Sequence, residues 1–204
     1  MSDYVSALIN QIKLNNTFQT MVIDSGEIDI LENAKQGLTY EENDFNGMFE
    51  KILKYEQDCY GIYEQNGFNL SILSRQKPIL SLINGINGFI SKLSEENKLK
   101  INDFFTKGKD LGIINFVLID SVDKIKKIEY ESWFKDNFNP NEGIFIGDGI
   151  NDQFTLKVTV RTNEVKETVD DDFCFVLKRG KPILVKYISS FENNSSDDEM
   201  LDIE

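Results

Sequence analysis

The residues whose types and spacing could do chemistry in this sequence lie at the ends of three short apolar runs. Each run has the composition of a buried strand. In open parallel sheets, ligands bind beyond the carboxyl ends of the strands, so residues at these ends form one candidate site. The candidate site comprises Asp24, Asn84, Gly85, Asp120 and Ser121.

Nucleotide hydrolysis is the first chemistry to consider at such an edge. One strand of a nucleotide-hydrolysing sheet should end in an acidic residue that holds magnesium, usually followed by a second acid that polarises the attacking water. The run 79–83 has the character of that strand, and it is followed by Asn84 and Gly85. Neither residue carries a negative charge or acts as a base, so the sequence argues against hydrolysis here and assigns no catalytic residue.

A glycine-rich phosphate cradle is also missing from the sequence. The pattern G-x-x-x-x-G-K-[ST] places backbone N–H groups and a lysine around phosphates. Gly-Lys pairs occur only at 108–109 and 180–181, and neither has the upstream glycine or a following Ser or Thr. The glycines of 143–149 do not open a helix, so we interpret that segment as a turn.

Some of the candidate residues also have a structural interpretation. Asp24 and Asp120 could satisfy backbone N–H groups at strand-to-helix turns. The acidic run 170–172 lacks the spacing of a calcium loop and indicates a solvated turn. Trp133 and Phe134 are candidate anchors for a protein partner, and packing in the core is the alternative.

The composition excludes several kinds of catalytic and metal site. The chain has no histidine, which excludes Ser-His-Asp and Cys-His nucleophile systems and histidine-ligated zinc. Its two cysteines, Cys59 and Cys174, are too few for a thiolate cage or a disulfide framework. We therefore expect no metal site and no cofactor bound by this chain.

The charge of the chain limits its partners. The 204 residues carry 22 Lys and Arg against 35 Asp and Glu, a net charge of −13. Binding to nucleic acid or to an anionic membrane needs clustered cations, so neither is expected of this chain alone. No apolar run of about 18 residues and no signal peptide is found, so we expect a soluble cytoplasmic chain.

Strands and helices alternate along most of the sequence. The alternation predicts an α/β fold with a mainly parallel sheet between layers of helices. We expect one domain over 1–188, and an acidic, disordered tail over 189–204. The expected elements are helices at 4–14, 45–65 and 122–136, helical segments between 86 and 105 of which the second is capped by Ser94, strands at 21–23, 79–83, 113–119 and 143–146, and a β-hairpin at 173–187 that turns at Gly180.

Four segments of this sequence resemble a known family of secretion ATPases. Residues 78–89, 107–113, 142–149 and 177–186 resemble the last ATPase domain of the EssC family, membrane-anchored FtsK/SpoIIIE-type proteins of the type VII secretion system. The resemblance covers 1–188 and implies a RecA-like three-layer sandwich that ends in a β-hairpin. It places the family's P-loop directly before the helix 4–14, and therefore upstream of Met1.

The resemblance also implies a function for the chain. Asn84 occupies the position of the family's magnesium-coordinating Asp, and Gly85 that of a catalytic acid, so a degenerate domain that recognises or gates secreted proteins is expected. In the family, ATP and magnesium are the cofactors. The implied partners are helical-hairpin secreted proteins of the WXG100 type and neighbouring ATPase domains. The implied location is the cytoplasmic side of the plasma membrane, reached through the full-length protein.

Two alternatives remain open at the sequence level. The chain could be a fragment of an active ATPase domain whose phosphate-binding loop lies upstream of Met1. It could also be a free-standing adaptor encoded at the same locus. An upstream reading frame that continues into Met1 would separate these two alternatives.

Overall fold

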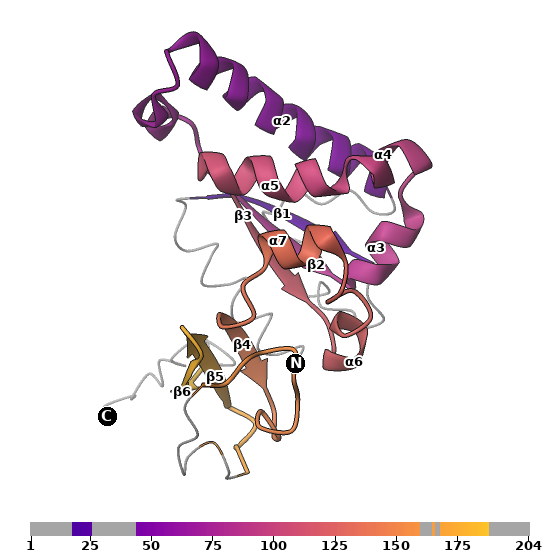
Figure 1. Cartoon of the computed structure of the whole chain (residues 1–204), viewed down its shortest axis with the longest axis vertical. Coiled ribbons are helices and arrows are strands. Elements are labelled where there is room, and N and C mark those ends of the chain that lie inside the picture. Colours follow the sequence, from indigo (N-terminus) through magenta and orange to yellow (C-terminus); the bar gives the residue numbers. More distant parts are fainter. Residues whose placement is uncertain (1–17, 26–43, 160–164, 166–167, 188–204) are drawn as a thin grey trace, which may run out of the picture.

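A computed structural model of the chain describes residues 18–25, 44–159, 165 and 168–187 (Figure 1). The helix expected at 4–14 and the acidic tail expected at 189–204 lie outside these residues. The described elements, in chain order, are β1 (Gln19–Asp24), α2 (Phe45–Gln65), the 3-10 helix η1 (Leu70–Arg75), β2 (Ile79–Asn84), α3 (Ile86–Lys92), α4 (Glu95–Leu99), α5 (Ile101–Leu111), β3 (Ile114–Ile119), α6 (Val122–Ile125), α7 (Ser132–Asn137), β4 (Gly143–Ile146), β5 (Phe173–Lys178) and β6 (Lys181–Lys186).

The first three strands form a parallel sheet in the order β1-β2-β3. In the register of this sheet, Asp24 lies opposite Asn84, and Asn84 lies opposite Ile119. The three strands therefore end at the same level. The predicted α/β fold with a parallel sheet is confirmed.

The longest helix, α2, begins and ends at the signals that its sequence carries. Asp44 Oδ1 accepts a hydrogen bond from the amide of Gly47 at 2.8 Å, which caps the first turn. At the other end, Gly67 has a φ of +67°, and the amide of Phe68 donates to the Tyr63 carbonyl at 3.0 Å, as in a Schellman motif. The expected span of 45–65 is confirmed.

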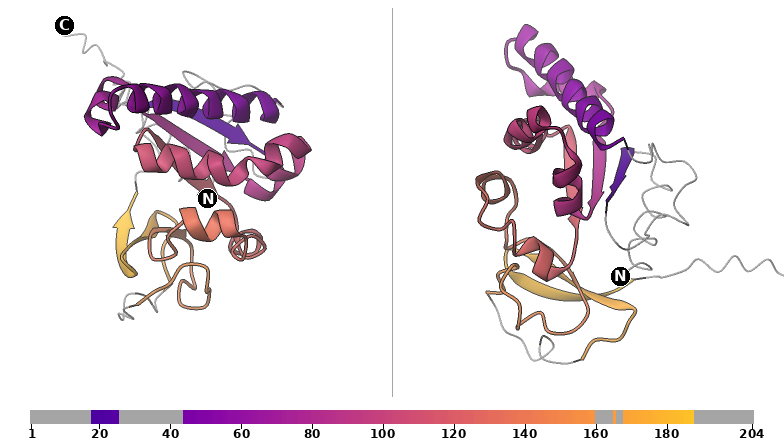
Figure 2. Two further views of the ribbon diagram at one scale, coloured as in Figure 1. Left: turned by 45° about the horizontal axis from the view of Figure 1, so that its top comes forward. Right: turned by 90° about the vertical axis from the view of Figure 1, so that its right-hand side faces the viewer.

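The helices of the described chain cover one face of the parallel sheet. Figure 2 shows α2, α3 and α5 on the same side of β1 to β3. Rings from these helices form an aromatic core, in which Phe49 stacks on Phe104 with ring centroids 4.4 Å apart. The second helical layer implied by the resemblance falls outside the described residues.

Strand β2 is buried on both faces, as its continuous apolar run predicts. Side chains alternate along a strand, so Ile83 and Leu82 point to opposite faces of the sheet. Ile83 is fully buried, and Leu82 is 1% exposed. A strand covered on both sides is typical of the centre of an α/β sheet, and β2 holds that central position.

The strand 143–146 does not belong to the parallel sheet, contrary to its expected place in a mainly parallel arrangement. It forms β4, which pairs antiparallel with β5 in a second sheet of order β4-β5-β6. A parallel pairing needs a crossover that packs on the sheet, but α7 packs against α5 instead, through Trp133 and Phe105. The second sheet has its own small core, which comprises Ile150, Val165, Phe175 and Leu177.

The expected hairpin is confirmed as β5 and β6. The two turn residues, Arg179 and Gly180, have φ values of +54° and +74°. Positive φ at both central residues is the geometry of a type I′ turn, which matches the twist of the two strands. No helix in the described parts of the chain is both long and apolar enough to cross a bilayer.

Candidate functional site

The structure brings the five predicted site residues to one edge of the parallel sheet. Asp24 and Asn84 end the neighbouring strands β1 and β2, and the amide of Gly85 donates to the carbonyl of Ile119 at 3.0 Å. Asp120 and Ser121 follow directly after Ile119. The edge is therefore the only place where these polar side chains could act on one ligand together.

The two central side chains of this edge bind each other. The Nδ2 of Asn84 donates a hydrogen bond to Oδ1 of Asp24 at 2.6 Å. Asn84 is 5% exposed, so the pair is largely shielded from water. A hydrogen bond to a carboxylate is among the stronger kinds. A metal ion that took Oδ1 of Asp24 as a ligand would compete with this hydrogen bond.

The Ser25 hydroxyl connects the end of β1 to the turn that follows β2 through hydrogen bonds. Its hydroxyl lies 2.5 Å from the Gly85 carbonyl oxygen and 3.1 Å from the Asn84 carbonyl oxygen, so one proton is shared between two acceptors. The backbone also approaches closely here, because a Cβ added to Gly88 would lie 2.7 Å from the carbonyl oxygen of Ser25. The turn is thus held by internal contacts.

Gly85 takes a backbone conformation that favours glycine, with φ +75° and ψ +62°. Its N–H group is already bonded to Ile119, so this amide is not available to a phosphate. A phosphate cradle needs several free N–H groups that converge on the ligand. Gly85 therefore offers no free amide to a phosphate at this turn.

Asp120 has the structural role that its sequence position left open. Its Oδ1 accepts a hydrogen bond from the amide of Ser121 at 2.9 Å, at the start of α6. Lys124 Nζ lies 3.9 Å from the same oxygen, and the side chain of Asp120 is 5% exposed. Its Oδ2 is buried without a hydrogen-bond partner in the described chain. Asp120 thus binds a backbone N–H group directly before α6, whose N-cap residue is Ser121.

Two residues near this edge were not singled out by the sequence. Ser25 closes the turn, as described above, and its only signal is its place directly after Asp24. Asn87 donates from Nδ2 to the carbonyl of Lys124 at 3.0 Å, which connects α3 to α6. The sequence offers no pattern that would mark such a contact between helices.

Trp133 and Phe134 do not form an exposed anchor. Trp133 is 7% exposed, and its ring stacks on Phe105 with centroids 5.1 Å apart and planes at 18°. Phe134 stacks on Phe138 at 5.2 Å and is partly buried against the same core. Core packing, the alternative considered from the sequence, is therefore what the structure supports.

The described residues contain no group of three or more side chains that could hold a metal ion. Both cysteines are buried and free. A shallow pocket lies at the opposite ends of the strands, where Gln19 and Ile79 begin β1 and β2, and α2 contributes Lys51 and Tyr55. This pocket is separate from the strand-end edge.

One titratable residue that the sequence analysis missed is Glu56 on α2. It is fully buried, and neither of its carboxylate oxygens has a hydrogen-bond partner within the described part of the chain. Burial raises the pKa of Glu56 from 4.5 to about 9, and the positive charge of Lys107 opposes this shift only in part. Glu56 lies against Gly108 of α5, away from the strand ends.

Comparison with known proteins identifies a solved structure with a similar fold. No protein-family model and no curated protein matches the sequence. Among solved structures, the cytoplasmic domain of EssC matches with a TM-score of 0.64, over 92% of this chain and 37% of that chain, at 10% sequence identity. The chain thus spans 37% of the length of that structure. Its α/β fold is one found within the cytoplasmic domain of EssC, as the resemblance in sequence implied.

Proposed function

We propose that this chain is a degenerate ATPase-type domain of a type VII secretion protein of the EssC kind. The proposal rests on the shared fold, which covers nearly the whole chain, and on the four segments that resemble the family. Its role is to recognise or gate secreted proteins rather than to turn over ATP. As part of such a protein, the domain would work on the cytoplasmic side of the plasma membrane.

The single observation that carries the loss of catalysis is the pairing of Asn84 with Asp24. Where hydrolysis needs an acid at the end of the central strand, an amide N–H group points at the neighbouring carboxylate. Magnesium binds oxygen ligands and strongly prefers carboxylates and phosphates. Because Asn84 Nδ2 donates to Oδ1 of Asp24, one carboxylate oxygen at the strand end is already engaged, and the central strand itself supplies no acid.

Calorimetric titration of the 204-residue chain with MgATP tests this reading. We expect no saturable heat at micromolar nucleotide. Micromolar affinity together with phosphate release would contradict the proposal.

Recognition is tested separately from nucleotide binding. In this proposal the partners are small helical-hairpin secreted proteins of the WXG100 type, together with neighbouring ATPase domains of the same polypeptide. The tagged chain should retain at least one such secreted protein from its own organism. If the tagged chain retained none of these secreted proteins, the proposed role in substrate recognition would be wrong, and only the similarity of fold would stand.

A further inference from the structure

Strand β6 lies at the edge of the second sheet and exposes apolar side chains. In the order β4-β5-β6, it has a described neighbour on one side only. Ile183, Leu184 and Val185 are 51%, 39% and 37% exposed. The backbone groups on the free side of such a strand are a template on which a further strand can pair.

The hairpin geometry determines which backbone groups of β6 face away from β5. Lys178 and Lys181 flank the two-residue turn and form the first bonded pair, and bonded pairs alternate from there. The amide of Tyr187 donates to the Asp172 carbonyl at 2.9 Å, which fits this alternation. The odd-numbered residues of β6 therefore bond to β5, whereas the N–H and C=O groups of Leu184 face outward.

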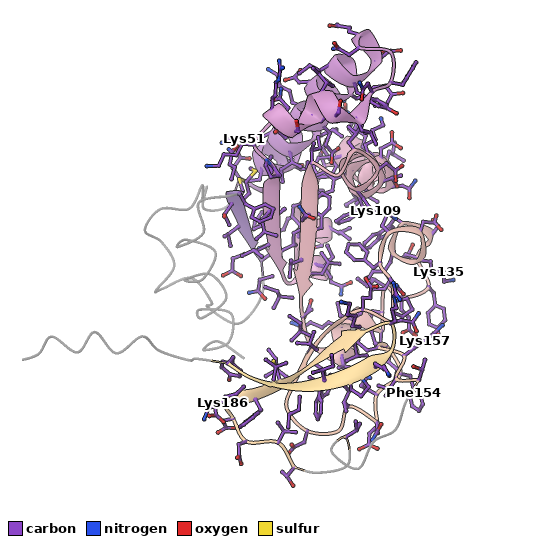
Figure 3. All side chains as sticks on the ribbon, turned by 90° about the vertical axis from the view of Figure 1, so that its left-hand side faces the viewer. Lys51, Lys109, Lys135, Phe154, Lys157 and Lys186 are labelled. Atoms are coloured by element: carbon purple, nitrogen blue, oxygen red, sulfur yellow. The ribbon has the colours of Figure 1, made fainter. Side chains whose placement is uncertain are left out.

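The two ends of the hairpin carry opposite charge. The hairpin tip, as we call it, comprises Lys157, Lys178, Arg179 and Lys181, all exposed. The acidic end, at the start of β5, comprises Asp170, Asp171 and Asp172. Lys186 also lies at this end, with its Nζ 2.6 Å from Oδ2 of Asp172, so the acidic end keeps a net negative charge. Figure 3 shows the labelled Lys157 and Lys186 at opposite ends of the hairpin.

An antiparallel second copy complements both ends of β6 at once. About a two-fold axis at Leu184, each Leu184 amide donates to the Leu184 carbonyl of the other copy, and each Lys186 amide donates to the Pro182 carbonyl of the other copy. On one face of the sheet, Ile183 of each copy packs against Val185 of the other. The hairpin tip of each copy then lies beside the acidic end of the other.

Proline and lysine often protect an edge strand from pairing, but neither prevents this arrangement. Pro182 has no N–H group, so the Lys186 carbonyl of the other copy receives no bond. Lys186 is exposed, and water can bind that oxygen. Lys181 lies toward the acidic end of the other copy, and Lys186 has Asp172 as a partner within its own chain.

Charge favours an antiparallel copy over other strands. A foreign strand rich in carboxylates would be attracted to the hairpin tip but repelled by the acidic end, and a basic strand would meet the reverse. A parallel copy would place tip beside tip and acidic end beside acidic end. The antiparallel copy matches opposite charges at both ends.

We propose that two copies of this chain pair antiparallel through β6 and join their second sheets into one. One strand pair buries less than the roughly 800 Å² per partner of a standard interface, so we expect a weak dimer with a Kd of about 10 to 100 µM. This proposal goes beyond the proposed function and does not depend on nucleotide or on secreted proteins.

Two measurements on the full 204-residue chain test for this dimer. Sedimentation equilibrium from about 5 to 500 µM covers the expected Kd and should show reversible formation of a dimer. Amide hydrogen exchange over the same concentrations should become slower at Leu184, because its N–H group becomes bonded only in the dimer.

A cysteine at position 184 tests the two-fold axis. Leu184→Cys places two thiols opposite each other, with Cα atoms about 5.5 Å apart, so mild oxidation should cross-link the two copies. In Ile183→Cys, the matched control, the two thiol-bearing residues are offset along the strands by more than about 7 Å, and cross-linking should be at least about tenfold slower. A mixture of Ile183→Cys and Val185→Cys should cross-link rapidly again. The natural Cys59 and Cys174 are buried.

Charge variants test the complementarity of the two ends. Lys178→Glu with Lys181→Glu should weaken the dimer about tenfold, because it places like charges together at both ends of the pairing. Adding Asp170→Lys with Asp171→Lys to the same chain exchanges the two signs and should restore the affinity to within about threefold of the wild type.

A control variant makes the same charge change elsewhere. Lys126→Glu with Lys127→Glu alters two exposed lysines after α6 and should leave the affinity within about twofold. Thermal unfolding of each variant confirms that the hairpin is intact before association is compared.

Several results would overturn the proposal. The first is a chain that stays monomeric up to about 500 µM, including one whose Leu184 amide is protected only by a protein from a lysate, because β6 would then bind a foreign strand. The second is cross-linking of Ile183→Cys alone as fast as that of Leu184→Cys, which would indicate a parallel pair or another register. The third is a dimer without added protection at Leu184. The fourth is a charge exchange that does not restore the affinity.

Discussion

Replacement of Glu56 by Gln should remove a large part of the pH dependence of stability. The carboxyl group is fully buried between α2 and α5, and its oxygens have no hydrogen-bond partner in the described chain. A Cβ added to Gly108 would lie 2.6 Å from Oε1 of Glu56, so the packing leaves no room for hydrating water on that side. A charged carboxylate is therefore strongly disfavoured in the folded state.

The sign and size of the effect follow from the pKa. Burial raises the pKa of Glu56 from 4.5 to about 9, so the folded chain holds a proton that the unfolded chain releases. The stability that protonated Glu56 contributes to the folded chain is fully present below pH 4.5 and is lost as the pH rises toward 9. In that interval, the free energy of unfolding falls by about 1.4 kcal/mol per pH unit. Between pH 5 and pH 8, the loss is about 4 kcal/mol at most.

Urea unfolding at pH 5 and at pH 8 measures this difference, with the fluorescence of the buried Trp133 as the probe. Glutamine stays neutral in both states, so Glu56→Gln should lose most of the pH-dependent change. The amide of the introduced glutamine is also buried. It changes the stability of the variant by a similar amount at both pH values, so this change cancels from the comparison. Glu64→Gln makes the same change at an exposed position of α2 and should follow the wild type.

The result that would refute this reasoning is a pH dependence of Glu56→Gln within about 1 kcal/mol of the wild type. It would mean that Glu56 is ionised in the folded state at neutral pH, and that a cation or water reaches it. If Glu64→Gln changed the pH dependence of the free energy of unfolding as much as Glu56→Gln, burial of Glu56 would not be the cause of the effect.

Two further substitutions test the strand-end edge by urea unfolding. Asn84→Asp places a second carboxylate beside Asp24 and should cost about 1 to 3 kcal/mol at pH 7. Adding Asp24→Asn should restore most of this loss, and an unchanged stability of the single variant would argue against the observed pairing. Gly88→Ala should cost about 1 to 3 kcal/mol, because the new Cβ would meet the Ser25 carbonyl oxygen at 2.7 Å. Gly61→Ala, which has nothing within 4 Å, should instead stabilise α2 by up to about 1 kcal/mol, and equal effects at the two glycines would contradict this packing.

The sequence predicted the sheet edge because the features that produce it are local. An apolar run such as 79–83 is typical of a strand buried on both faces, and parallel strands end at one edge, so Asn84 was expected at the same edge as Asp24 and Asp120. The hydrogen bond between Asn84 and Asp24 was not predictable, because it depends on register and on rotamers. The same limit applies to Ser25, which acts on a turn 60 residues further along the chain.

Where the sequence analysis failed, tertiary packing decided between local alternatives. The run 143–146 is apolar enough for either sheet, and its antiparallel pairing with β5 is a long-range choice. Glu56 did leave a signal, because it falls between Ile52 and Cys59 on the apolar face of its helix. A charged residue at such a position indicates either an ion pair or a neutral carboxyl. Burial of both oxygens without a described hydrogen-bond partner favours the neutral carboxyl.

The contacts at the strand ends indicate what a magnesium site at this edge of the sheet would require. Replacing Asn84 by Asp would return a carboxylate to the central strand, but it would stand beside Asp24 with the turn still fastened by Ser25 and the Gly85 amide still bonded to Ile119. Magnesium needs several oxygen ligands in a defined arrangement, and two carboxylates supply only part of it. A single substitution at position 84 would therefore not by itself create a magnesium site at this edge.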